Sequence, residues 1–373
     1  MGRPNLNLLY FSRGYTTHDR RYLQSFGDAG YRVSYLRLTG ERLDNRPLPE
    51  GVCPIAWLGD DRPLDTLVDY FVRYAALRRI VAELHPQVVL AGPIQTSAFL
   101  VALTAYSPLV TMSWGSDLLV DASRNVWMRH ITRYTLHRSA GVLGDCQAVR
   151  DKIHAFAPLA DNLIVTFPWG IDLERFVPGS SALSLRQDLG WIDKPVLIST
   201  RTWEPIYAID VLVRAFARVH ERHPKARLLL LGEGSQAPMI RRLISQLNLT
   251  DCIHAPGWIS YELLPEYFRM ADVYVSSALS DGTSISLLEA MACGLPVVVT
   301  NNHGNLEWVK PGENGWLVVP GDYVSLADAL DEALTDPSRL AKMKQANSAS
   351  ARAKADWNRN FPQLLQLLQQ VAG

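Results

Sequence analysis

Short apolar segments alternate with helix-like segments along the whole chain, and this alternation constrains the fold more than any other feature. Strands are predicted at 6–11, 31–38, 87–90, 109–113 and 141–143, and again at 196–200, 227–231, 253–255, 273–276 and 297–299. Helices are predicted between them, among others at 18–29, 66–84 and 210–223. Such alternation is typical of parallel sheets with helices on both faces. The sequence therefore predicts an α/β protein with doubly wound parallel sheets.

The length of the chain, 373 residues, predicts about two domains, and 48% hydrophobic residues suffice for two cores. A second strand–helix series starts at Lys194, after a segment at 178–191 that we interpret as an interdomain linker. We predict an N-terminal domain at 1–177, a C-terminal domain at 178–355 and a final helix within 356–373. That helix is amphipathic, as expected of a last helix that covers a core.

Charge and cysteine content argue against several classes of partner. Basic and acidic residues balance at 37 each, so the composition gives no reason to expect nucleic acid as a partner. The four cysteines form no Cys-x-x-Cys pair, which argues against a zinc site or disulfides and for a reducing compartment. The N-terminus has no secretory apolar region, and no apolar run approaches the roughly 20 residues that span a bilayer. We expect a cytoplasmic protein.

A polar loop bracketed by two carboxylates carries the strongest functional signal. Asp281 precedes a run of small residues, and Glu289 lies well inside the helix that follows. Unpaired backbone N–H groups at a helix start bind anions, and small side chains let a phosphate approach them. Glu289 can accept hydrogen bonds from a ribose and Asp281 from a second sugar, so the loop predicts a nucleotide-sugar site. The other candidate donor contacts of this loop are Gly282, Thr283, Ser284 and Ile285.

This segment resembles the donor-site signature of the retaining family-4 glycosyltransferases, which have the GT-B fold. Their pattern has two glutamates separated by seven residues; here Asp281 replaces the first and Glu289 keeps the second. The strings at 168–178, 304–309 and 312–315 also resemble the family in order and spacing. The resemblance implies two Rossmann-like domains that face each other across a cleft, and it suggests that the final helix at 356–373 crosses back onto the first domain instead of covering a local core. The first would bind the acceptor and the second the nucleotide-diphosphate sugar, with a UDP- or GDP-sugar as the expected donor.

The resemblance also assigns roles outside this loop. The family supplies an Arg and a Lys to the diphosphate after the first strand of the second domain. Arg201 stands at the Arg position, where its fork suits phosphate, and Tyr207 takes the place of the missing Lys. Tyr207 either donates a hydrogen bond to the donor or only packs the loop. Trp258 and Ile259 either border the nucleobase or form a packed loop. Gly14 either lets the backbone approach the diphosphate or is an ordinary turn glycine.

Two residues are candidates for the acceptor site. Trp114 follows a strand where related enzymes have a His near the reacting sugar; a tryptophan can stack on a sugar but cannot act as a base. Asp117 either orients an acceptor hydroxyl or caps the following helix. The segment at 124–138 carries four arginines and no acid between apolar residues. It is either a solvated helix face or a surface that rests on anionic lipid at the inner face of a membrane, which would favour a lipid-linked acceptor.

Together these features predict a retaining hexosyltransferase that acts on a hydroxyl of a sugar, glycolipid or small molecule, with Arg201, Asp281 and Glu289 as catalytic residues. No Asp-x-Asp motif follows a strand, and the pair at 60–61 lies in a Pro-containing loop, so we expect no metal and no cofactor. Two alternatives stay open. A sugar-nucleotide epimerase would need an acid–base residue where Trp114 stands, and the missing Lys would be compatible with a non-catalytic nucleotide-sugar binder.

Overall fold

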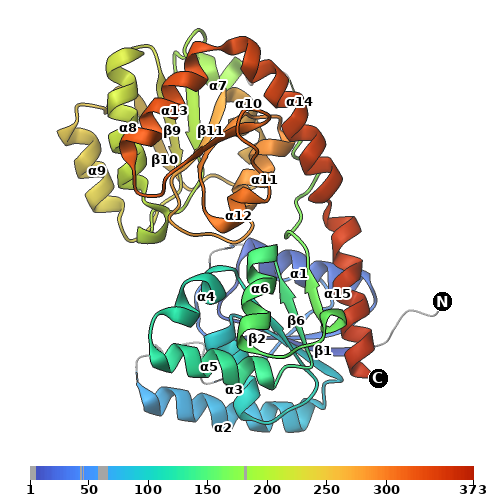
Figure 1. Ribbon diagram of the computed structural model, residues 1–373. Coiled ribbons are helices and arrows are strands. Elements are labelled where there is room, and N and C mark those ends of the chain that lie inside the picture. The colour runs from blue at the N-terminus through green and yellow to red at the C-terminus, as the bar shows by residue number, and fades with distance from the viewer. Residues whose placement is uncertain (1–5, 43, 45, 58–65, 180–182) are drawn as a thin grey trace. The chain divides into compact units, whose positions relative to one another are not determined.

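The computed structural model describes residues 6–42, 44, 46–57, 66–179 and 183–373 (Figure 1). The acidic pair at 60–61 lies outside these residues. The chain divides into two compact units, one formed by Met1–Phe167 with Phe361–Gly373 and the other by Pro168–Asn360. The division falls after Phe167, earlier than the boundary after residue 177 that the sequence predicts. None of the described helices is both long and apolar enough to cross a membrane.

Unit 1 is built on a seven-stranded parallel sheet with the order β3-β2-β1-β4-β5-β6-β7. Its strands are β1 (Asn7–Ser12), β2 (Arg32–Arg37), β3 (Cys53–Pro54), β4 (Val88–Ala91), β5 (Leu109–Met112), β6 (Gly141–Gly144) and β7 (Ile164–Thr166). Its helices are α1 (Thr17–Asp28), α2 (Leu67–Leu84), η1 (Ile94–Ala98), α3 (Phe99–Leu103), α4 (Ser116–Leu119), η2 (Asp121–Ser123), α5 (Val126–His137), α6 (Gln147–Phe156) and η3 (Asp161–Leu163). Helices α1 and α2 each begin at a capping box, which satisfies amide groups of the first turn.

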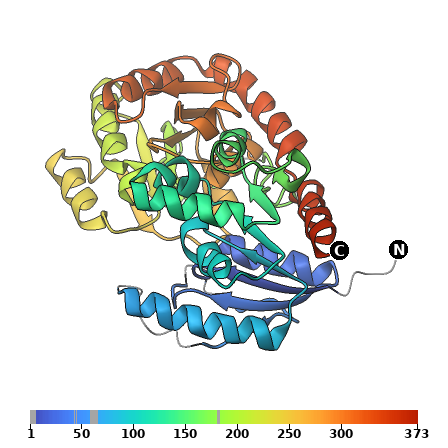
Figure 2. The ribbon, with the colours of Figure 1, turned by 60° about the horizontal axis from the view of Figure 1, so that its bottom comes forward.

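Helices cover both faces of this sheet, as its continuously apolar strands require. Leu9 and Phe11 of β1 belong to the core that α2 and α3 complete. Tyr10, on the opposite face, contacts the rings of Tyr22 and Phe26 in α1. In Figure 2, α2 and α1 accordingly lie on opposite sides of the blue strands.

Unit 2 repeats this architecture with six parallel strands in the order β10-β9-β8-β11-β12-β13. Its strands are β8 (Val196–Ser199), β9 (Arg227–Leu231), β10 (Ile253–Gly257), β11 (Val273–Ser276), β12 (Val297–Thr300) and β13 (Gly315–Val318). Its helices are α7 (Leu183–Asp188), η4 (Pro205–Tyr207), α8 (Ile209–Arg222), α9 (Ala237–Gln246), α10 (Leu264–Met270), α11 (Ile285–Ala292), α12 (His303–Leu306), α13 (Tyr323–Thr335) and α14 (Pro337–Lys354). Six strands in this order are typical of the Rossmann fold.

Alternate residues of the unit 2 strands enter two separate cores. Leu197 of β8 packs with α8, α9 and α13, whereas its neighbour Ile198 packs with α10, α11 and α14. Tyr274 of β11 faces the second core, on the same side as α11. The predicted fold class, an α/β protein with two doubly wound parallel sheets, is confirmed.

The predicted strands and helices are present with small shifts at their ends, but three strands were missed: β3, β7 and β13. The segment at 178–191 is not a linker in its described part. It contains α7, and Leu185 and Leu189 pack against the second core of unit 2. An interpretation based on its Ser and Gly content overlooked these apolar residues.

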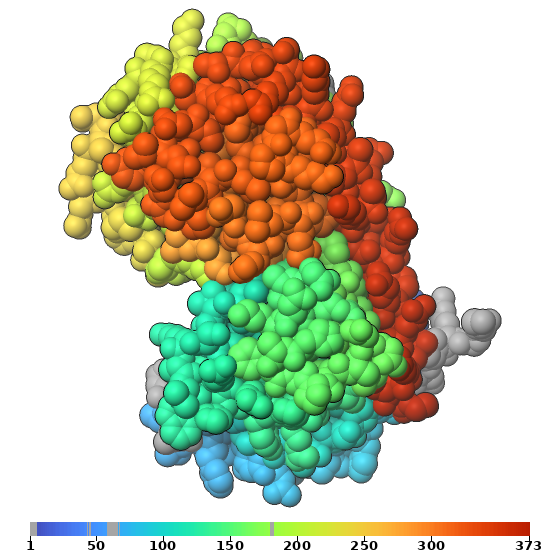
Figure 3. Space-filling view, in the orientation of Figure 1, coloured from blue at the N-terminus to red at the C-terminus, as the bar shows by residue number. Residues whose placement is uncertain are grey.

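The C-terminal helix α15 (Trp357–Ala372) packs on unit 1 although its sequence follows unit 2. The ring of Phe361 lies 5.1 Å from that of Phe26 and 6.3 Å from that of Tyr22 in α1. Leu367 lies so close to Gly141 of β6 that a Cβ at Gly141 would be 2.9 Å from it. Figure 3 shows the red spheres of α15 beside the green spheres of unit 1. Apolar residues at helical spacing in α15 thus complete the core of the first unit.

Candidate active site

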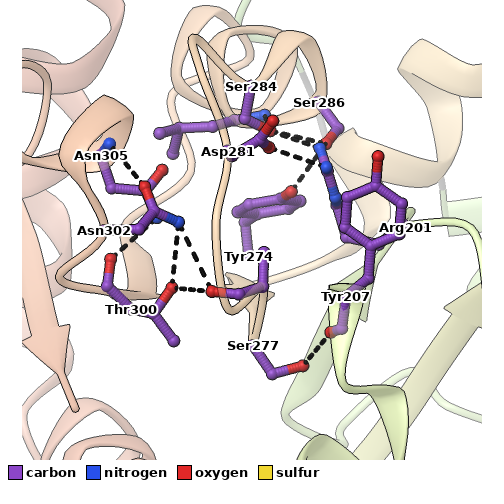
Figure 4. Close-up of polar contacts among 12 residues, drawn as sticks. Arg201, Tyr207, Tyr274, Ser277, Asp281, Ser284, Ser286, Thr300, Asn302 and Asn305 are labelled. Carbon is purple, nitrogen blue, oxygen red and sulfur yellow. Dashed lines mark hydrogen bonds and ion pairs between the residues drawn. The ribbon is translucent and has the colours of Figure 1, made fainter. Parts of the chain in front are cut away.

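The loop predicted to bind the donor joins β11 to α11 in unit 2. Strand β11 pairs with β8, so the loops that follow their carboxyl ends leave the sheet at the same edge, where α/β proteins bind ligands. Arg201 follows β8 and Asp281 follows β11, and the two side chains meet there (Figure 4). The Ser284 side chain caps α11 by accepting a hydrogen bond from the Leu287 amide. The structure therefore brings together residues that are far apart in the sequence.

Arg201 is the centre of this site. Its Nη2 lies 2.7 Å from Oδ2 of Asp281, and its Nη1 donates to the hydroxyls of Ser284 at 2.6 Å and Ser286 at 3.1 Å. The residue is only 8% exposed. Burial alone would lower the pKa of Arg201, but the Asp281 carboxylate, Tyr207 and Tyr274 together outweigh burial and the pKa is raised. The guanidinium is therefore a permanent positive charge in a largely water-excluded place.

Two tyrosines enclose this guanidinium. The Tyr207 ring centroid lies 4.0 Å from Cζ of Arg201, a cation–π contact. The Tyr274 hydroxyl lies 2.8 Å from the Ser286 hydroxyl, which itself accepts from Arg201. Tyr207 was expected in the place of a phosphate-binding Lys, and the structure puts its ring against the Arg instead. Tyr274 was missed, although a tyrosine between two valines of a buried strand was a signal.

Burial raises the pKa of Asp281, and the charge of Arg201 opposes that rise. Because its carboxylate lies on Arg201, the group expected to hold the donor sugar and the group expected to hold the diphosphate are paired in this structure. Thr283 and Gly282 are buried in the same loop, and Ile285 is half-buried at the start of α11. Glu289 lies on α11 and is 5% exposed. The pKa of the nearby Cys293 is raised to about 12, mainly by burial and secondly by the charge of Glu289.

A second polar network supports the loop from β12 and α12. The Thr300 hydroxyl donates to the Ala278 carbonyl at 2.5 Å, and Asn302 caps α12 by accepting from the Asn305 amide at 3.0 Å (Figure 4). A Cβ at Gly304 would lie 1.8 Å from the carbonyl oxygen of Gly282, so only glycine allows this contact. Sequence reasoning noted the string at 304–309 but missed this role, because the contact joins two distant loops.

The remaining donor candidate in unit 2 is the loop after β10. Gly257 turns the chain with a φ of 87°, and the next residue, Trp258, is 61% exposed. Ile259 is half-buried and packs against the second core of unit 2. Ile259 therefore packs into the loop. Trp258 exposes its ring to solvent, and its contact with a nucleobase stays a prediction.

In unit 1, Gly14 lies in the loop after β1. Its carbonyl accepts hydrogen bonds from the hydroxyls of Ser12 at 2.6 Å and Tyr35 at 2.7 Å. A Cβ at Gly14 would lie 2.8 Å from the carbonyl oxygen of Glu41. The close approach that the sequence suggested for this glycine is therefore an approach to the chain itself, and its contact with a diphosphate stays a prediction.

Asp117 organises the loop that carries Trp114. Its Oδ1 accepts from the Ser113 hydroxyl at 2.6 Å and from the amides of Trp114 and Leu118 at 3.0 Å each, and its Oδ2 accepts from the Ile94 amide at 3.1 Å. Asp117 is 3% exposed, and burial raises its pKa to about 6 although these hydrogen bonds oppose the rise. Asp117 lies inside α4, whose N-cap residue Gly115 has no side-chain cap, so its carboxylate holds this loop rather than capping the helix. Its contact with an acceptor hydroxyl stays a prediction.

Trp114 itself is half-buried, and its ring lies edge-on to His18 of α1 at 6.3 Å. Among the described residues, no group of three or more His, Cys, Asp or Glu side chains is arranged to hold a metal ion.

Two family models match the chain, one in each unit. "Glycosyl transferases group 1" matches residues 184–350, and "Glycosyl transferase 4-like" matches residues 7–145. Among curated proteins, a GDP-mannose-dependent alpha-(1-6)-phosphatidylinositol monomannoside mannosyltransferase of Mycolicibacterium smegmatis is 29% identical over 320 residues, which are 84% of this chain and 75% of that protein. A D-inositol 3-phosphate glycosyltransferase of Stackebrandtia nassauensis is 32% identical over 215 residues, which are 55% of this chain and 48% of that protein.

Two solved structures share the fold. Anabaena HepE in complex with UDP and glucose has a TM-score of 0.82 at 18% identity, covering 98% of this chain and 99% of that one. The sucrose-phosphate synthase of Thermosynechococcus elongatus has a TM-score of 0.81 at 19% identity, covering 98% of both chains. These likenesses confirm the predicted GT-B fold.

Proposed function

The chain belongs to the group 1 glycosyltransferases, and on that premise we propose that it transfers a hexose from a nucleotide-diphosphate sugar to an acceptor hydroxyl, with retention of configuration and without a metal ion. Membership of this family implies that the protein is a glycosyltransferase and that it uses a nucleotide sugar. The finer statements, on stereochemistry, metal, donor and acceptor, are the proposal.

The observation that carries the proposal is the buried Arg201, held by Asp281 and two serine hydroxyls at the carboxyl end of the unit 2 sheet. In the reaction the bond between the anomeric carbon and a phosphate oxygen breaks, and negative charge develops on the departing diphosphate. A guanidinium already fixed at that position lowers the barrier, because it needs no reorganisation as the charge appears. The departing oxygen takes the proton of the acceptor hydroxyl, whose oxygen bonds the anomeric carbon from the same face.

The ion pair between Arg201 and Asp281 suggests how the donor engages the site. The diphosphate oxygens compete with the Asp281 carboxylate for the same guanidinium. Once released, that carboxylate can accept hydrogen bonds from hydroxyls of the donor sugar, while Glu289 accepts them from the ribose. Donor binding and the release of Asp281 are then a single exchange of partners around Arg201.

We propose GDP-mannose as the first donor to test, with UDP-sugars as the alternative. The mycobacterial relatives that align over most of this chain are named as GDP-mannose-dependent. Their named acceptor is a phosphatidylinositol mannoside, so the acceptor proposed here is a hydroxyl of a sugar or lipid-linked sugar. The proposed location is the cytoplasm, at the inner face of a membrane if the acceptor is lipid-linked. We expect EDTA to leave turnover unchanged, because Arg201 and backbone amides provide the positive charge.

A nucleotide panel tests the donor proposal directly. The matching nucleoside diphosphate among GDP, UDP and ADP should raise the unfolding temperature, because a ligand at 100 times its Kd adds about 2.7 kcal/mol of stability. The protein should then slowly hydrolyse the corresponding sugar nucleotide without an acceptor. Isomerisation of the sugar would instead identify an epimerase, and tight binding without turnover a sensor. A product with inverted anomeric configuration would contradict retention.

Arg201→Gln tests the residue on which the proposal depends. We expect donor turnover to fall by about 10²–10³-fold, the usual cost of removing a group that stabilises developing charge. Stability should fall by about 1–3 kcal/mol, because Asp281 loses its partner. Arg222→Gln is the matched control, since Arg222 pairs with Asp328 on the exposed surface of the same unit. Equal turnover in the two variants would contradict the proposal.

A further inference from the structure

Helix α5 presents charge of a single sign to solvent. The exposed cationic or titratable side chains of residues 124–138 are Arg124, Arg129, His130, Arg133, His137 and Arg138, and the segment contains no acid. The whole chain has equal numbers of acidic and basic residues, so this is a local separation of charge. An ordinary solvated helix face mixes both signs.

The same face exposes large apolar side chains. Trp127 is 77% exposed and Val126 is 69% exposed in the first turn of α5, and Tyr134 is exposed two turns later. The core-facing side of the helix is provided by other residues, with Leu136 and Thr132 fully buried. Trp127 is therefore not required to pack α5 onto unit 1. Figure 3 shows the turquoise segment that contains α5 at the surface of this unit.

Some arginines elsewhere on the surface pair with acids, and none of those at 124–138 does so among the described residues. Arg79 pairs with Glu83, and Arg222 pairs with Asp328 and Asp331. Within the described ranges, no ion pair engages any arginine of the segment 124–138; Arg138 only contacts the Tyr134 ring of its own helix. These guanidinium groups are thus available to anions outside the molecule.

We propose that this face, the α5 surface formed by Arg124, Val126, Trp127, Arg129, Arg133, Tyr134 and Arg138, docks on an anionic phospholipid bilayer. Arginines next to such a bilayer are attracted to its phosphates, and tryptophan prefers the headgroup level, where its ring is dry and its N–H is wet. Val126 beside Trp127 gains only from an apolar partner. This favours lipid over a nucleic-acid duplex, whose phosphates would engage the arginines alone. The docking does not depend on the transfer reaction, but it would bring the enzyme to a lipid-linked acceptor.

Vesicle flotation tests the proposal with the whole protein. We expect binding to phosphatidylcholine vesicles that contain 30% phosphatidylglycerol, weak binding to pure phosphatidylcholine, and loss of binding at 0.5 M NaCl, where charges are screened within a few ångströms. The double variant Arg129→Gln/Arg133→Gln should weaken binding about 30-fold, because each lost arginine weakens binding about fivefold and the two effects multiply. Trp127→Ser should weaken binding by about tenfold at low salt and leave the salt dependence of binding unchanged, because it removes apolar contact and no charge.

The control is Arg214→Gln with Arg242→Gln, which removes the same charge from exposed positions of unit 2. An unchanged thermal shift with nucleoside diphosphate shows that every variant is folded and that unit 2 is intact. Equal binding to both vesicle types, or equal weakening in the control and α5 variants, would overturn the proposal. Binding of an oligonucleotide that competes with vesicles and is insensitive to Trp127→Ser would identify a nucleic-acid surface and also overturn it.

Discussion

Arg201 is positioned before any ligand arrives. Its guanidinium has a carboxylate on one side, two serine hydroxyls on another and an aromatic ring across its face. A long side chain held in this way loses little further freedom when an anion binds. At the scale of residues, Arg201 is thus a preorganised cation paired with Asp281, and the proposed function has the donor diphosphate replace Asp281 as its partner.

The Tyr207 ring, rather than its hydroxyl, should matter for this positioning. Tyr207→Phe keeps the ring 4.0 Å from Arg201, so we expect donor turnover within about twofold of wild type. Tyr207→Ala removes the contact and should lower kcat/KM by about tenfold, since a partly buried cation–π pair is worth about 1–2 kcal/mol. The measurement is donor hydrolysis at subsaturating substrate. If the Phe variant were as impaired as the Ala variant, the hydroxyl would be the replacement for the missing Lys.

The pKa of Asp117 predicts a pH dependence of stability. Its folded pKa of about 6 lies above the ordinary value of 3.8, so the folded state binds the proton more tightly. The stability it contributes is therefore complete below pH 3.8 and is lost as the pH rises through 6, a loss of about 3 kcal/mol. The measurement is the free energy of unfolding by denaturant, for the wild type and Asp117→Asn, between pH 4 and pH 7. As the pH rises, the wild type should lose stability relative to the variant. Parallel pH profiles would contradict this assignment.

At the scale of elements, the donor loop depends on a contact between two turns. Gly304 in α12 lies against the Gly282 carbonyl of the loop between β11 and α11. Side-chain caps on both helices, from Ser284 and Asn302, hold each turn in place. The loop conformation is therefore set by β12 and α12 as much as by its own sequence.

Gly304→Ala tests this dependence. The new methyl group would lie 1.8 Å from a backbone oxygen, which cannot move away as the end of a flexible side chain can. We expect a loss of about 1–3 kcal/mol in stability and weaker nucleotide binding. The matched control is Gly27→Ala in α1, where the nearest atom would be 3.9 Å away and alanine should stabilise the helix by about 0.5–1 kcal/mol. Unchanged nucleotide affinity in Gly304→Ala would show that the contact is not needed.

The short strands that the sequence did not predict have a common cause. Strand β13 begins at Gly315, the second residue of an Asn-Gly pair that predicts a turn. A Cβ there would lie 2.4 Å from the Val297 carbonyl oxygen of β12, so this glycine serves close strand packing rather than turn formation. A three-residue strand such as β7 likewise exists only because β6 pairs with it. Local periodicity has too few residues to identify such strands.

At the scale of the whole molecule, the two units depend on different parts of the chain. The proposed donor site lies within unit 2, whereas helix α15 packs on unit 1 through Phe361 and its neighbours. A sequence-local definition of domains would assign α15 to unit 2. Stability and donor binding should therefore respond separately to changes in this helix.

Phe361→Ala tests that separation. The buried ring packs on Tyr22 and Phe26, and its removal should destabilise unit 1 by about 3–5 kcal/mol. The affinity of unit 2 for the nucleoside diphosphate should stay within about twofold of wild type. Calorimetry with and without the nucleotide separates the two effects, because the ligand raises only the transition of the unit that binds it. A parallel loss of nucleotide affinity would show that the donor site depends on α15.

Much of the architecture and part of the site were readable from sequence. Apolar strands alternating with helices predicted both sheets, and the loop around Asp281 predicted the donor site through its small residues and spacing. Arg201 was found because the family that the chain resembles has an arginine after the first strand of its second domain. Sequence reasoning did not find the roles of Tyr274, Thr300 and Asn302. The sequence around a polar residue in or after a buried strand does not reveal which distant residue it contacts.

By itself, the sequence determined the class of fold and the chemistry available to it, because periodicity, small loop residues and charge are properties of short segments. Only the tertiary structure decided that Asp281 lies on Arg201, that the Tyr207 ring covers the same guanidinium, and that the last helix belongs with the first sheet. These pairings join segments brought together by the order of strands in each sheet and by the packing of helices on it. Neither is a property of any short stretch of residues.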